Sequence, residues 1–111
     1  MNQFQVNCST DEELINACNS ITKKRCSNPK WLDLEEKEYT PSSDTAVIIV
    51  DMRNAEDCVF KVYTSKDRYV DSVGMNNKGC AVVIPWKSGR KFVCYGYCRV
   101  AEVTATQENS T

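Results

Sequence analysis

The chain alternates short apolar runs with polar stretches, and the first clear pattern predicts a helix. Thr10 is followed by Glu13 three residues later, which is typical of a helix N-cap with a capping box. The apolar side chains that follow recur at helical spacing: Leu14, Ile15, Cys18 and Ile21. We therefore predict a helix over about residues 11–24, with Cys18 on its buried face.

The remaining apolar runs predict strands, because they alternate with period two or form short continuous stretches. Residues 4–8 alternate, and the continuous run 46–50 indicates a strand covered on both faces. Residues 58–64 follow it closely enough for an antiparallel hairpin. Residues 80–84 and 91–100 predict a second hairpin around residues 87–90, with a bulge or close backbone approach at Gly96.

Two polar stretches complete the expected architecture. Residues 27–45 contain an acidic run, so we expect a long surface loop pinned by Trp31 and Tyr39, with room for a short strand near Glu38. Residues 104–111 are polar and are expected to fray. The prediction is an α+β fold, with one helix packed on a mainly antiparallel sheet of four to five strands. A single disulfide-braced domain would cover residues 1–103, with a flexible polar tail over 104–111.

The seven cysteines change this picture, because a core this small needs additional stabilisation. A zinc site is disfavoured, since the chain has no histidine and its only close pair is Cys94-x3-Cys98. Reduced core thiols are disfavoured by the density of cysteines. We predict no metal and no cofactor. We expect disulfides joining six of the seven cysteines, with the connectivity left open: Cys8, Cys18, Cys26, Cys58, Cys80, Cys94 and Cys98.

Disulfides indicate an oxidising compartment, so we expect a secreted, extracellular protein. The chain begins Met-Asn-Gln-Phe-Gln without the apolar run of a signal peptide, and we interpret it as the mature sequence behind an added Met1. The formal charge of −1 predicts no general attraction to nucleic acid. No apolar run has the length of a membrane span. We expect a monomer.

The absence of histidine also bears on catalysis. It removes Ser-His-Asp and Cys-His chemistry, and leaves only carboxylates such as those of the acidic run 33–38 for acid–base work. A glycosidase would need two carboxyl groups held across a cleft, and nothing in the sequence shows one. We therefore predict that the protein is not an enzyme.

Binding is the remaining class of function, and the second predicted hairpin carries the residue types that dominate contact surfaces. The candidate binding residues are Trp86, Arg90, Tyr95, Tyr97 and Arg99. The alternative is that these side chains simply cover the sheet. Residues 87–91 also resemble an exposed basic protease-inhibitor loop, and Trp31, Trp86 and the tyrosines would suit a carbohydrate-binding module. Asn109 lies in a glycosylation sequon and is the better acceptor of two.

The pattern as a whole resembles the small secreted cysteine-rich proteins of filamentous fungi, a class that includes killer-toxin-like and effector proteins. The features that carry this resemblance are Asn7-Cys8 near the start, a short capped helix holding Cys18, and a β-rich remainder ending in Cys94 and Cys98. The resemblance implies a secreted effector or toxin that acts by binding a host or competitor protein. The class has no shared catalytic residues.

Overall fold

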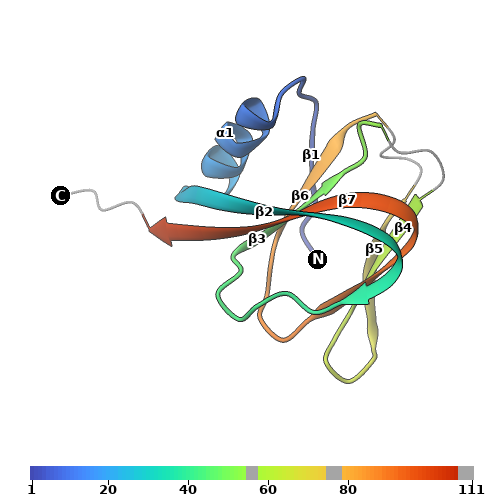
Figure 1. Ribbon diagram of the computed structural model, residues 1–111. Helices are drawn as coiled ribbons and strands as arrows, with labels where there is room; N and C mark the ends of the chain where they lie inside the picture. The colour runs from blue at the N-terminus through green and yellow to red at the C-terminus, as the bar shows by residue number, and fades with distance from the viewer. Residues whose placement is uncertain (55–57, 75–78, 108–111) are drawn as a thin grey trace.

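A single curled antiparallel sheet forms most of the structure, a computed structural model that describes residues 1–54, 58–74 and 79–107. Within these residues one helix packs beside seven strands (Figure 1). The elements are β1 (Phe4–Val6), α1 (Asp11–Thr22), β2 (Lys24–Tyr39), β3 (Val47–Asp51), β4 (Cys58–Tyr63), β5 (Tyr69–Val73), β6 (Ala81–Pro85) and β7 (Lys91–Gln107). The predicted α+β class is confirmed, whereas the predicted number of strands was too low.

β7 organises the sheet because it pairs with three other strands. The sheet order is β1-β6-β3-β7-β4-β5, and β2 pairs with β7 in addition. The first part of β7 pairs with β4 and the later part with β3, while β2 follows β7 along nearly its whole length. β2 therefore takes one edge of β7, and β4 and β3 share the other edge in succession. β7 bends, and the sheet curls around it (Figure 1).

The sheet separates two apolar clusters. Ile48 and Val50 face a core enclosed by the curl, which includes Phe60 and Phe92. Val47 and Ile49 face the other way, toward Leu14 and Cys18 of α1. The prediction that this run forms a strand covered on both faces is therefore confirmed, and alternation along β3 supplies both cores from consecutive residues.

The helix begins where the sequence predicts. The Thr10 side chain accepts a hydrogen bond from the Glu13 N–H at 3.1 Å, and a Glu13 carboxylate oxygen accepts one from the Ser9 N–H. Leu14 and Cys18 are fully buried, as the apolar stripe indicated. The helix ends at Thr22, because Lys23 adopts a left-handed C-cap conformation with a φ of 55°.

The expected loop over residues 27–45 is wrong for most of its length. Residues 24–39 form β2, which pairs antiparallel with β7 from Lys24 opposite Gln107 to Tyr39 opposite Phe92. The acidic run hides an alternation in which Leu32 and Leu34 point toward the enclosed core. Their polar neighbours face solvent, which is the usual arrangement of a strand with one buried face.

Both predicted hairpins are also wrong. β3 pairs with β6 and β7, and β4 pairs with β5 and β7. The two strands of the first expected hairpin, β3 and β4, are therefore not neighbours. β6 pairs with β1 and β3, and β3 lies between β6 and β7. In both cases the two strands of the expected hairpin are separated in space by a third strand, β7 between β3 and β4, and β3 between β6 and β7.

The tail expected from residue 104 does not begin there, because β7 continues to Gln107 and pairs with the start of β2. Residues 108–111, with the glycosylation candidate Asn109, lie outside the described residues. No helix in the described part of the chain has the length and apolarity to cross a membrane.

Removing the helix cap tests the start of α1. Thr10→Ala should lower the free energy of unfolding by about 1 kcal/mol, because the Glu13 N–H loses its acceptor. Denaturant unfolding followed by circular dichroism measures this loss. Ser20→Ala, at an exposed position of the same helix, is the matched control and should not destabilise the protein. Equal stability of the Thr10 variant and the wild type would contradict the assignment of Thr10 as the cap.

Candidate functional site

The five candidate binding residues do not form one surface. Trp86 is only 8% exposed and meets Phe92 edge to face, with ring centroids 5.9 Å apart. Arg90 lies at the turn after β6, beside Thr64 and Ser65. The expectation that Trp86 contributes to an exposed patch is therefore wrong, because its ring is buried against the aromatic residues of the core.

The two tyrosines of β7 are exposed, Tyr95 at 43% and Tyr97 at 52%. They lie on either side of Gly96, where β7 adopts a φ of 83°. Beyond this point the Tyr97 hydroxyl donates a hydrogen bond of 2.6 Å to Asp33 of β2. Tyr95 instead lies on the face shared with β4, opposite Val59. Tyr95 and Tyr97 thus lie in two different regions of the surface.

Tyr95 belongs to a cluster of three tyrosines and a lysine, here called the tyrosine face: Lys61, Tyr63, Tyr69 and Tyr95. The Lys61 ammonium lies 5.5 Å from the centroid of the Tyr95 ring, within cation–π range. Tyr63 and Tyr69 pack edge to face with centroids 6.1 Å apart. Burial, hydrogen bonding to Tyr95 and the neighbouring phenols raise the pKa of Tyr63 above its ordinary value. The Tyr63 hydroxyl therefore stays protonated at neutral pH and can donate a hydrogen bond.

Sequence analysis missed most of the tyrosine face. Lys61 and Tyr63 alternate with buried residues along β4, and this signal was readable as the outward face of a strand. Tyr69 lies outside the strands expected from the sequence, although it begins β5 and is 58% exposed. Only the pairing of β4 with both β5 and β7 brings these side chains together.

Arg99 is held in a network of charges rather than presented to a partner. Its guanidinium lies 3.6 Å from the centroid of the Trp31 ring and pairs with Asp51 at 3.0 Å and Asp11 at 3.1 Å. Arg53 pairs with the same two aspartates, at 2.9 Å and 2.6 Å. This arginine–aspartate network joins the first turn of α1 to β3 and β7, which gives it a structural role.

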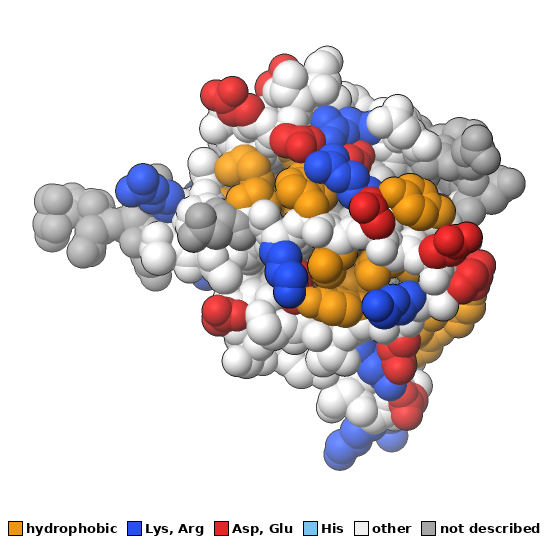
Figure 2. Space-filling view, in the orientation of Figure 1, with side chains coloured by type: hydrophobic (Ala, Val, Ile, Leu, Met, Phe, Trp, Pro, Cys, Tyr) orange, Lys and Arg blue, Asp and Glu red, His pale blue; other side chains and the backbone are white. Residues whose placement is uncertain are grey.

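Asp51 is the buried centre of the network. Burial alone would raise the pKa of its carboxyl, but hydrogen bonds and charge from Arg53 and Arg99 outweigh burial and hold the pKa below its usual value. The same arginines lower the pKa of Asp11. The network borders a hollow of about 170 Å³ lined by Asp51, Arg53, Asn54, Tyr97, Cys98 and Arg99. Figure 2 shows acidic and basic side chains next to one another on this view of the molecule, with hydrophobic patches between them.

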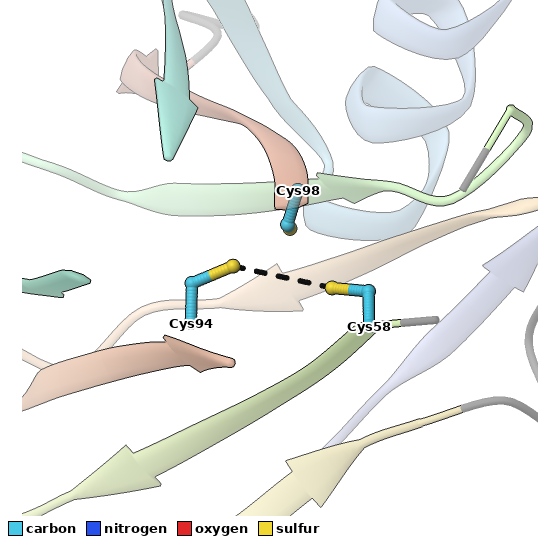
Figure 3. A group of neighbouring side chains, drawn as sticks. All are labelled: Cys58, Cys94 and Cys98. Carbon is cyan, nitrogen blue, oxygen red and sulfur yellow. Dashed lines mark hydrogen bonds between the residues drawn. The ribbon is translucent and has the colours of Figure 1, made fainter. Parts of the chain in front are cut away.

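The cysteines do not form the expected disulfides in this structure, since no two described sulfur atoms lie at bonding distance. The Sγ atoms of Cys58 and Cys94 lie 3.9 Å apart. Cys98 completes a group whose three sulfurs all lie within 4.8 Å of one another (Figure 3). All three residues are at most 2% exposed. The predicted bracing by six paired cysteines is therefore corrected for this structure, in which packing and hydrogen bonds of the sulfurs order the three clustered side chains.

The three clustered thiols influence each other's ionisation. Hydrogen bonds from Cys94 and Cys98 lower the pKa of Cys58, so Cys58 is the first of the three to lose its proton. Hydrogen bonding to Cys58 raises the pKa of both Cys94 and Cys98. Elsewhere, burial and the nearby Cys26 raise the pKa of Cys18 to about 12. Cys18 is therefore an unreactive thiol at neutral pH.

Titrating Asp51 tests the role of the network. Because folding lowers the pKa of this carboxyl, its stabilising contribution is complete above the unfolded value of about 3.9 and is lost as the pH falls through the lower folded value. Asp51→Asn should cost about 3 kcal/mol at pH 7, since it leaves two partly buried arginines short of an anion.

Thermal unfolding between pH 7 and pH 2.5 measures the effect, and the gap between wild type and Asp51→Asn should narrow at low pH. Asp67→Asn is the matched control, because Asp67 is 78% exposed where it pairs with Lys91 and should matter little. A gap that stays constant with pH would contradict the assigned ionic role of Asp51.

Comparison with known proteins adds no further constraint on these residues. No family model, no curated protein and no solved structure matches this chain.

Proposed function

We propose that this chain is a non-enzymatic binding protein that contacts another protein through its tyrosine face. In the biological setting that the cysteine content favours, it is a secreted effector or toxin-like protein whose partner is a host or competitor protein. The observation that carries the proposal is the group of three tyrosines and one lysine on a single rigid sheet surface. Tyrosine is enriched among the residues that dominate binding energy.

Rigidity is the first physical argument. Phe60 and Phe92 are fully buried beneath the face, with ring centroids 4.4 Å apart, and they fix the strands that carry the tyrosines. Tyr69 is further held by a hydrogen bond of 3.1 Å from its hydroxyl to Ser72. Side chains that are already ordered lose little entropy on binding, so more of the contact energy remains as affinity.

Charge is the second argument. Among the described residues no carboxylate lies within ion-pair distance of Lys61, whereas Lys91 is paired with Glu38 and Asp67. Lys61 is therefore available to a partner's carboxylate while its position over Tyr95 keeps it in place. We expect a partner surface with an apolar centre and at least one acidic group.

Two alternative functions, a carbohydrate-binding module and a protease inhibitor, depend on other residues. A carbohydrate-binding module would lose both tryptophans, since Trp86 is buried and the face of Trp31 is covered by Arg99. Only the exposed tyrosines would remain to stack on a sugar. The protease-inhibitor alternative rests on the exposed turn at residues 87–89, which lines a hollow with Thr64 and Ser65 and with no residue of the tyrosine face. Incubation with trypsin-like and papain-like proteases separates it from the proposal, and we expect no inhibition.

Binding variants test the tyrosine face directly. A panel of extracellular proteins screened with the wild-type chain supplies a partner, and affinities are then measured for Tyr95→Ala, Lys61→Ala and Tyr97→Ala. Tyr95→Ala should weaken binding by about tenfold or more, and Lys61→Ala by a smaller factor. Tyr97→Ala is the matched control, because it removes an equally exposed tyrosine of β7 outside the face.

Circular dichroism of each variant confirms that the fold is retained. Weakening by Tyr97→Ala with no effect of Tyr95→Ala would contradict the proposed surface and would move the contact to the neighbourhood of Asp33.

A further inference from the structure

The bend in β7 brings two distant cysteines together. Cys94 and Cys98 are four residues apart, and an extended strand would separate them by about 13 Å. Their sulfurs instead lie within 4.8 Å. Tyr95 and Gly96 of β7 together face the single residue Glu36 of β2, which is the pattern of a β-bulge. The Glu36 carboxylate accepts a hydrogen bond of 2.7 Å from the Gly96 N–H, and this contact fixes the bend.

A third thiol enters from the other side of β7. Cys58 is the first residue of β4 and pairs with Gly96, so it lies between the two arms of the bend. Figure 3 shows its sulfur directed toward that of Cys94, with Cys98 above both. Sequence spacing disfavoured a metal site because Cys94 and Cys98 have no nearby partner in sequence. The fold supplies that partner from 36 residues earlier in the chain.

The distances between the sulfurs resemble those of a metal site more than those of a disulfide. A disulfide requires a separation of about 2.05 Å, so the 3.9 Å between Cys58 and Cys94 would have to shrink by almost half. Three sulfurs that lie about 2.3 Å from a single coplanar ion are about 4.0 Å apart. We propose that, in the reduced protein, Cys58, Cys94 and Cys98 form a three-thiolate site for a soft metal ion, best suited to monovalent copper.

The donor set selects this type of ion. Thiolates are soft ligands that favour Cu(I), zinc and iron–sulfur clusters. Structural zinc is almost always four-coordinate, but the chain contains no histidine. In the described part of the chain no carboxylate joins the three sulfurs. Three soft donors without a fourth fit an ion that accepts three-fold coordination, and hard ions such as Mg²⁺ are excluded because they need oxygen ligands.

The three sulfurs lie between a surface hollow and the apolar core. Cys98 lines the hollow beside the arginine–aspartate network, and its neighbour Tyr97 lines it too. All three cysteines also belong to the enclosed core that contains Phe60 and Phe92. An ion could therefore reach the sulfurs from the hollow at Cys98, and the core would screen it from water. The site does not depend on the proposed binding function.

Titration of the reduced protein with Cu(I) under anaerobic conditions, against the chelator bicinchoninate, tests the proposal. The wild type should take up one equivalent. Cys58→Ser and Cys94→Ser should each lower the affinity at least about 100-fold, the upper end of what losing even an outer-shell partner costs. Cys8→Ser is the matched control, because Cys8 is half-buried outside the cluster, and it should retain wild-type affinity.

Two further measurements use the wild-type protein, so they remain decisive if a variant fails to fold. X-ray absorption should show three sulfur ligands at about 2.3 Å from copper. Peptide mapping after alkylation should show Cu(I) protecting Cys58, Cys94 and Cys98 while leaving the reactivity of Cys8 unchanged. Fewer than three sulfur ligands, equal protection of Cys8, or a Cys58–Cys94 disulfide that persists in reductant and blocks uptake would overturn the proposal.

Discussion

The contact between Gly96 and Glu36 is the constraint on which the rest of the structure depends. Both residues have positive φ, 83° and 48°, and the Glu36 carboxylate receives the Gly96 N–H. The bend at these two residues lets β7 pair with β4 through residues 91–96 and with β3 through residues 99–103. Without the bend, the enclosed core, the separation of Tyr95 from Tyr97 and the convergence of the three thiols would all be lost. A glycine is required on the β7 side, because other residues adopt such a φ only at a cost.

Local patterns in the sequence predicted the local structure well. The capping residues located the start of α1, the continuous run at residues 46–50 indicated a doubly covered strand, and Gly96 indicated a bulge. Long-range pairing could not be predicted in this way. The sequence places β6 just before β7, but only the complete sheet shows that β3 lies between them. The acidic residues of β2 conceal a period-two pattern, because only Leu32 and Leu34 mark its buried face within the run 32–38.

In the candidate site, too, local features could be predicted from the sequence but long-range contacts could not. Tyr95 was predicted as an exposed contact residue and is exposed, yet its neighbours in space come from β4 and β5. Trp86 and Arg99 have the composition of a binding surface, but the first completes an aromatic core and the second completes a charge network. Residue type alone does not distinguish these roles, because both contact surfaces and buried clusters favour aromatic rings and planar cations. Burial and pairing decide between them.

The position of β7 in the chain has a consequence for folding. β2, β3 and β4 all precede β7 and all pair with it, so during synthesis the edges that meet β7 stay unpaired until β7 emerges. Native contacts between distant residues slow folding, and unpaired strand edges invite association with other chains. The charged side chains of both signs along β2 then act as protection, because charged residues on an unpaired strand disfavour its association with another chain before β7 arrives.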